Sequence, residues 1–156
     1  MAENDQKIGI VSCSGEDCLG GTISRLATRR MLEERPDGSV TICLPLYLAG
    51  GEEERSFAED YPTIAVDGCS KCCAKRATEK YSGKVTAAID VSELIGKEAA
   101  EAGALSTKNL SDIHNEMVDR VAAEIKTKID DILKQAPTDG KTSGEKPDCG
   151  CGCGCC

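Results

Sequence analysis

Sulfur chemistry stands out in this sequence, because eleven of its 156 residues are cysteine and only one is histidine. A thiolate is both a nucleophile and a ligand for soft or borderline metal ions. Six of the cysteines lie in the first half of the chain and five in its last eight residues. In a reducing compartment so many cysteines indicate metal or thiol chemistry more often than structural disulfides, and an odd number cannot pair completely within one chain. We therefore expect the function to involve the thiols.

Three of the first six cysteines, Cys13, Cys43 and Cys69, each come at the carboxyl end of a predicted strand. The carboxyl ends of parallel strands lie along one edge of a sheet, where loops converge and ligands bind. Thiols that are far apart in the sequence are therefore expected to meet there. Cys73 follows Cys69 by one helical turn and supplies a fourth thiol. Four thiolates suit a tetrahedral ion such as zinc, with bonds of about 2.3 Å.

Other interpretations of these cysteines stay open. Free cysteine is also a small hydrophobic residue, and Cys43 lies within an apolar run. Cys18 and Cys72 are further candidates, as alternative ligands, as a resolving thiol or as passive residues. Cys69-Ser-Lys-Cys72 is a C-x-x-C motif of the kind that dithiol oxidoreductases use. The alternatives to a metal-binding protein are thus a dithiol oxidoreductase or sulfur carrier using Cys69, Cys72 and Cys73, and an Fe–S electron carrier.

The elements that must position these thiols follow from the apolar pattern. Short runs rich in Val and Ile predict strands, at 7–13, 39–44, 62–67 and 84–91. Helical spacing or composition is found between them, at 22–34 and 70–81. The longest apolar stripe runs from Ile113 to Leu133 and predicts a helix from Ser111, as N-cap, to near Pro137. Strands that are apolar on both sides favour an α/β fold, here a small three-layer Rossmann-like or flavodoxin-like parallel sheet with helices on both faces.

The chain divides into one domain and a tail. Residues 1–136 are expected to form the domain, since a chain of this length usually builds a single core. The composition then becomes polar, so 137–156 is expected to be a disordered linker and tail. Five tail cysteines, four of them in C-x-C spacing with glycine between, suit Cu(I) or another soft ion, unless the tail is a nonspecific thiol-rich extension. They are Cys149, Cys151, Cys153, Cys155 and Cys156.

Composition excludes several classes of function. The 27 acidic and 19 basic residues give a net charge of −8, which argues against nucleic-acid binding. The start of the chain is polar and acidic, unlike a secretory signal, and no apolar run reaches the length of a membrane span, so we expect a cytoplasmic protein without membrane contact. A phosphatase loop after Cys13 needs arginine where Leu19 stands. A single histidine, His114, gives a conventional hydrolase little support.

One stretch of the sequence resembles a known family. Asp67-Gly68-Cys69 followed by Cys73-Ala74 is similar to the motif of DGC domain proteins, which take their name from this triplet. The similarity extends to Cys13-Ser14-Gly15, to Cys43 and to the segment 89–97, and so covers about residues 7–134.

The resemblance has implications for the site. DGC domains are regarded as zinc-binding, so it implies that Cys13, Cys43, Cys69 and Cys73 are zinc ligands. Cys72 and Cys18 are thiols beyond the family's pattern. We therefore expect a cytoplasmic metal-binding protein, with zinc in the domain and a soft metal in the tail. Its expected role is metal handling or delivery, with a metal-accepting or sulfur-accepting protein as partner.

Overall fold

The computed structural model describes residues 6–13 and 15–135. Within these residues four strands form a parallel sheet in the order β2-β1-β3-β4. They are β1 (Ile8–Ser12), β2 (Ser39–Val40), β3 (Thr63–Asp67) and β4 (Ala87–Asp90). The α/β fold and the parallel sheet predicted from the sequence are confirmed.

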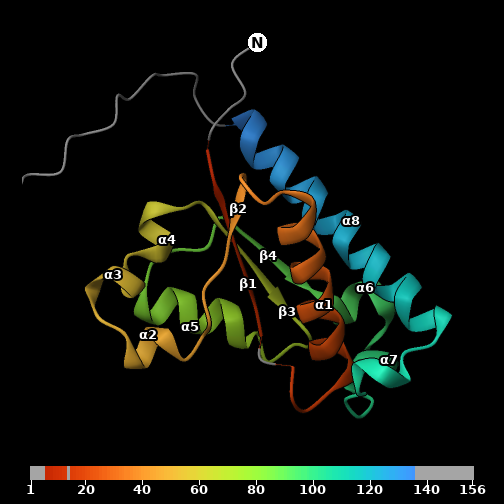
Figure 1. The fold of residues 1–156 in the computed structure, drawn as a ribbon. Coiled ribbons are helices and arrows are strands. Elements are labelled where there is room, and N and C mark those ends of the chain that lie inside the picture. The colour runs from red at the N-terminus through yellow and green to blue at the C-terminus, as the bar shows by residue number, and fades with distance from the viewer. Residues whose placement is uncertain (1–5, 14, 136–156) are drawn as a thin grey trace, which may run out of the picture.

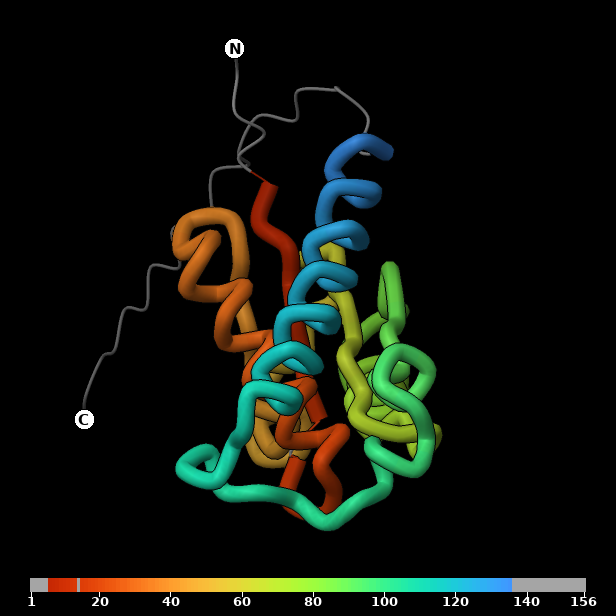
Figure 2. Tube along the Cα trace, turned by 90° about the vertical axis from the view of Figure 1, so that its right-hand side faces the viewer, coloured from red at the N-terminus to blue at the C-terminus, as the bar shows by residue number. Residues whose placement is uncertain are grey.

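Helices cover both faces of the sheet (Figure 1). One face carries α1 (Leu19–Glu34), α6 (Val91–Ile95), α7 (Lys97–Glu101) and α8 (Asp112–Gln135). The other carries α2 (Leu46–Ala49), α3 (Glu52–Arg55), α4 (Phe57–Asp60) and α5 (Cys73–Tyr81). Figure 2 shows α8 running beside α1 over the same face, and these two helices are in contact along their lengths. A short 3-10 helix, η1 (Thr107–Asn109), precedes α8.

Two apolar clusters hold the three layers together. Side chains alternate along a strand, so neighbouring residues face opposite sides of the sheet. Ile10 and Val66 accordingly pack with α1 and α8, whereas Val11 and Ala65 pack with Tyr47 and the other residues of the second face. All five of these side chains are fully buried. The two-sided apolar character of the strands is therefore explained by a core on each face.

Some element boundaries differ from the predictions. The second strand was predicted over 39–44 but ends at Val40. The last helix begins at Asp112 as expected, yet Ile113, the first residue of the predicted stripe, is 64% exposed. The buried stripe of α8 begins at Val118 because the first turn of the helix extends beyond the core. The helix predicted over 70–81 begins only at Cys73.

Two further predictions bear on the rest of the chain. Within the part of the chain that the structure describes, no helix has the combination of length and apolar character that crossing a membrane requires. The predicted linker and tail, with Cys149, Cys151, Cys153, Cys155 and Cys156, lie outside the described residues. The expectations for the tail stay predictions.

Candidate functional site

The candidate site lies at the carboxyl ends of the neighbouring strands β1 and β3. After β1 the chain enters α1 on one face, and after β3 it enters α5 on the other. Because β1 and β3 are neighbours, the two connecting loops leave the sheet in opposite directions and open a crevice at the carboxyl ends of these strands. A cavity of about 410 Å³ lies there. Ligands of open α/β sheets bind at this kind of position.

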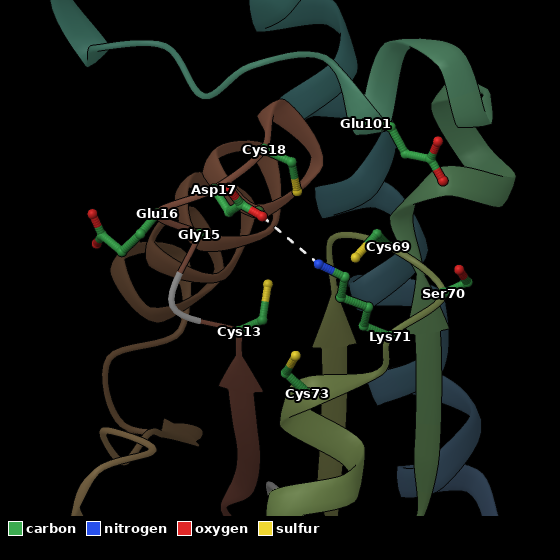
Figure 3. Close-up of a pocket in the computed structure, with 11 residues that line it drawn as sticks. Cys13, Gly15, Glu16, Asp17, Cys18, Cys69, Ser70, Lys71, Cys73 and Glu101 are labelled. Atoms are coloured by element: carbon green, nitrogen blue, oxygen red, sulfur yellow. Dashed lines mark ion pairs between the residues drawn. The ribbon is translucent and has the colours of Figure 1, made fainter.

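Four thiols line the cavity, and their sulfur atoms point toward the space between the two loops (Figure 3). Cys13 follows β1, and Cys18 precedes α1. Cys69 follows β3, and Cys73 is the first residue of α5. The structure therefore brings together three of the four residues predicted as ligands, and it adds Cys18, which the sequence indicated as a further candidate. Their role as ligands stays a prediction.

Cys43 does not line the cavity. It was expected at the carboxyl end of a strand, but β2 ends three residues earlier. Ile42 and Leu44 are partly buried against the second-face core, so Cys43 between them is exposed to solvent. Its predicted position beside the other thiols is therefore not what the structure shows.

Cys72 also lies outside the residues that line the cavity. It is the N-cap of α5 and has left-handed backbone angles, with φ 51° and ψ 47°. Residues 69–72 form a turn, closed by a hydrogen bond from the Cys72 amide to the Cys69 carbonyl of 3.1 Å. The expectation that one helical turn separates Cys69 from Cys73 was therefore wrong, because Cys69 precedes the helix.

Asp67 explains why α5 begins where it does. Its Oδ1 accepts a hydrogen bond from the Ala74 amide at 2.6 Å, and its Oδ2 accepts one from the Lys75 amide at 3.0 Å. These amides belong to the first turn of α5 and have no partner within the helix. Asp67 is only 2% exposed, and burial raises the pKa of its carboxyl group, while the two amides act to lower it. The carboxylate thus fixes the loop that carries Cys69 and Cys73.

Replacing Asp67 by alanine is expected to lower the free energy of unfolding by about 3 kcal/mol, because one buried and one partly buried amide lose a charged partner. Asparagine keeps one acceptor oxygen and is expected to cost roughly half as much. Urea unfolding measures both changes. Glu79, an exposed carboxylate of the same helix, supplies the control variant Glu79→Ala, which is expected to stay within about 0.5 kcal/mol of wild type. Equal losses in Asp67→Ala and Glu79→Ala would contradict the capping role.

Direct backbone contact brings the two loops together. A Cβ atom on Gly68 would lie 2.2 Å from the amide nitrogen of Gly21, and one on Gly20 would lie 2.0 Å from the carbonyl oxygen of Gly68. Neither position has room for a side chain. The start of α1 therefore packs against the loop after β3, which places Cys13 and Cys18 opposite Cys69 and Cys73.

Cys13 is held by polar partners within the pocket. Its sulfur lies 3.3 Å from the Ser24 hydroxyl oxygen and accepts a hydrogen bond from the Gly68 amide at 3.3 Å. Burial raises the pKa of the Cys13 thiol, and the hydrogen bonds of Ser24 and Gly68 oppose this effect. A negative charge on this sulfur is therefore costly unless a cation shares the pocket. Ser24 was not predicted from the sequence, since nothing in a helical pattern marks one serine as a partner of Cys13.

The rim of the pocket is acidic. Glu16, Asp17 and Glu101 line it, with Lys71 as the basic residue among the lining residues. Lys71 Nζ lies 3.7 Å from Asp17 Oδ2, so this exposed ion pair joins the two loops across the mouth (Figure 3). The surplus of carboxylates favours a cationic ligand over an anionic one. Glu101 was not predicted as a site residue, because only the folded chain brings α7 to this edge.

Cys18 is positioned by the end of α7. It forms an isolated antiparallel bridge with Gly103, and the next amide, that of Leu19, donates to the carbonyl of Ala102 at 2.7 Å. These contacts fix the start of α1 against the segment that follows α7. Cys18 therefore faces the cavity from the side opposite to α5, as Figure 3 shows.

Thiols are suitable ligands for a soft or borderline metal ion, but these four sulfur atoms are spaced too widely to bind one ion together. Among residues 6–13 and 15–135, no three His, Cys, Asp or Glu side chains lie close enough together to hold a metal ion. The four thiols instead surround a cavity that is wider than one ion needs. A metal ion would require the sulfur atoms to move closer together.

Comparison with known protein families identifies the family to which this protein belongs. A family model described as the DGC domain matches residues 9–125, which is most of the chain, and the protein therefore belongs to the DGC domain family. The resemblance found in the sequence is confirmed. Comparisons with curated proteins and with solved structures gave no match. Each residue of the triplet has a distinct role in the structure: Asp67 caps α5, Gly68 packs against α1, and Cys69 lines the pocket.

Proposed function

We propose that this protein binds one thiophilic metal ion, zinc in the first place, in the pocket at the carboxyl ends of β1 and β3. The observation that carries the proposal is that four thiols from two loops face one cavity at the switch point of the sheet. Four thiolates in tetrahedral arrangement are a common zinc site. The ligands that we propose are Cys13, Cys18, Cys69 and Cys73.

Cys18 takes the place of Cys43 in this proposal. Cys43 is exposed beyond the end of β2, whereas Cys18 already faces the cavity. The four sulfur atoms must move closer together to bind one ion. Side-chain rotation can achieve this, because a change of one cysteine rotamer moves its sulfur by roughly 3 Å. Cys73 is exposed, and Cys18 and Cys69 are partly exposed, so their side chains have space for such rotation.

Electrostatics favours a bound cation. Burial raises the pKa of the Cys13 thiol in the absence of positive charge, and the nearby carboxylate of Asp67 adds to this effect. A divalent cation offsets these negative charges and favours the deprotonated thiols that bind it. When bound, zinc would link the loop after β1 to the loop after β3. An anionic small molecule would meet the three carboxylates of the rim, of which Glu16 and Asp17 are in ion pairs and Glu101 is in none with the residues that the structure describes.

The exposure of the ligands suggests a role in metal handling. All four proposed ligands are partly or fully exposed to solvent, so an ion bound by them would be accessible from outside the protein. Incoming thiols have access to an ion held in this way, so we propose that the protein passes its metal to a metal-accepting protein of the cytoplasm. The tail cysteines, which lie outside the described residues, are proposed to bind Cu(I) or another soft ion.

Elemental analysis tests the pocket without interference from the tail. We define the tail-serine protein as the full-length chain with serine at all five tail positions, Cys149, Cys151, Cys153, Cys155 and Cys156. After anaerobic purification and incubation with zinc, dialysis is expected to leave about one zinc per chain in a colourless protein. Loss of all zinc on dialysis would overturn the proposal. A brown protein that contains iron and sulfide would show that the pocket binds an Fe–S cluster and not zinc, which would also overturn the proposal.

A further inference from the structure

Cys69, one of the four pocket thiols, has another cysteine close to it in the chain that does not line the pocket. Cys69 lines the cavity, but Cys72, three residues later, does not. The hydrogen bond from the Cys72 amide to the Cys69 carbonyl closes a tight turn between them. The ends of such a turn lie within about 7 Å of each other at Cα, and disulfides typically join Cα atoms about 4.4–6.8 Å apart. The backbone therefore holds these two cysteines within bridging range.

The backbone of Cys72 is unusual. Among residues 6–13 and 15–135 it is the one non-glycine residue with a positive φ. Left-handed angles cost about 1–2 kcal/mol for a residue with a Cβ atom, and glycine or asparagine usually occupies such positions. Strain of this kind concentrates at functional sites. Here the turn places a cysteine at a position where backbone preference alone favours another residue.

We propose that Cys69 and Cys72 are a dithiol that a neutral or cationic low-molecular-weight disulfide oxidises to an intramolecular disulfide. The rim has three carboxylates, two of them in ion pairs with Arg25 and Lys71, so its net charge stays negative and disfavours an anionic disulfide. The consequence for zinc rests on the proposed function. Oxidation removes the Cys69 thiolate from the proposed zinc ligands and so weakens zinc binding.

The reaction balances with the disulfide as the oxidant. The Cys69 thiolate, whose proton goes to solvent, attacks one sulfur of the disulfide R–S–S–R; a Cys69–S–R bond forms and R–S⁻ leaves. The Cys72 thiolate then attacks the Cys69 sulfur and displaces the second R–S⁻. The two cysteines lose two electrons, the disulfide gains them, and the two protons end on two R–SH molecules.

Peptide mapping of metal-free tail-serine protein tests the dithiol. The protein is incubated anaerobically with hydroxyethyl disulfide, a neutral oxidant, and its remaining thiols are alkylated. Lys71 lies between the two cysteines, so trypsin leaves two peptides, 56–71 and 72–75, that only a disulfide holds together. We expect this bridged pair in the protein with Cys73→Ser and its loss in the proteins with Cys72→Ser and Cys72→Asn. Asparagine suits the left-handed backbone and guards against a folding defect.

Two results of the mapping would overturn the dithiol. One is the absence of the bridged pair from every protein. The other is a bridged pair that persists with Cys72→Ser and disappears with Cys73→Ser, which would make Cys73 the partner of Cys69. Because this step uses metal-free protein, neither result depends on the zinc site.

Zinc titration tests the second half of the proposal. We expect the oxidised tail-serine protein to bind zinc at least tenfold more weakly than the reduced protein, and the reduced Cys72→Asn protein to bind zinc as tightly as its reduced parent, because Cys72 is not a proposed ligand. Equal affinity of the oxidised and reduced proteins would overturn the link between the disulfide and the pocket. If neither form binds zinc, the proposed function fails and that link fails with it, whereas the dithiol stands on the mapping alone.

Discussion

Replacing Gly68 by alanine is expected to destabilise the fold by about 3 kcal/mol and to separate the two loops of the pocket. The new Cβ atom would lie 2.2 Å from the Gly21 amide nitrogen and 2.5 Å from the Gly20 carbonyl carbon. Both neighbours are backbone atoms of α1, so no side-chain rotation relieves the overlap. The helix or the loop must shift, and the Gly68 hydrogen bond to Cys13 is then lost.

Urea unfolding measures the loss of stability, and the rate of thiol alkylation at Cys13 measures the opening of the pocket. Gly103 provides the matched control, because a Cβ atom there meets nothing within 4 Å. Gly103→Ala is expected to leave the alkylation rate unchanged and to alter the stability by less than about 1 kcal/mol. Similar behaviour of Gly68→Ala and Gly103→Ala would show that the backbone contact does not hold the site together.

Replacing both Cys69 and Cys73 by serine in the tail-serine protein is expected to abolish retention of zinc after dialysis. Serine hydroxyls do not replace thiolates as ligands for zinc, and only Cys13 and Cys18 would remain of the proposed set. The zinc-dependent part of the stability should disappear as well, since a ligand that binds only the native state stabilises it by mass action. Elemental analysis and thermal unfolding with and without zinc measure the two effects.

Cys43→Ser serves as the matched control for this variant. Cys43 is a free, exposed thiol outside the pocket, so its replacement is expected to leave one zinc per chain. Loss of zinc from Cys43→Ser together with full retention in the double variant would contradict the ligand set that the structure suggests. Such a result would also return Cys43 to the role implied by the family resemblance.

Most of the fold could be predicted from residue patterns because each pattern reflects a local physical requirement. The runs around Ile10 and Ile64 are apolar at successive positions, and each strand has a core on both of its faces. Residues 118–129 repeat with helical spacing because one side of α8 packs on α1. The start of α5 could not be predicted in the same way, since it depends on the carboxylate of Asp67 reaching two amides beyond an intervening turn.

The candidate site was only partly predictable for the same reason. The rule that ligands bind at strand ends correctly placed Cys13 and Cys69 at one edge of the sheet. The rule was wrong for Cys43 because it assumed a second strand longer than the chain forms. Contacts between distant segments, such as Gly20 with Gly68 and Cys18 with Gly103, leave no trace in local spacing. They decide which thiols face the cavity.

X-ray absorption at the zinc edge tests the central claim most directly, because it counts the atoms bound to the metal. The sample is the tail-serine protein loaded with one zinc per chain, so that no tail thiol contributes. Four sulfur ligands at about 2.3 Å are predicted, with no nitrogen or oxygen neighbour in the same shell. In the Cys43→Ser form of this protein the same spectrum is expected. A shell dominated by oxygen or nitrogen at about 2.0–2.2 Å would contradict a thiolate site in the pocket.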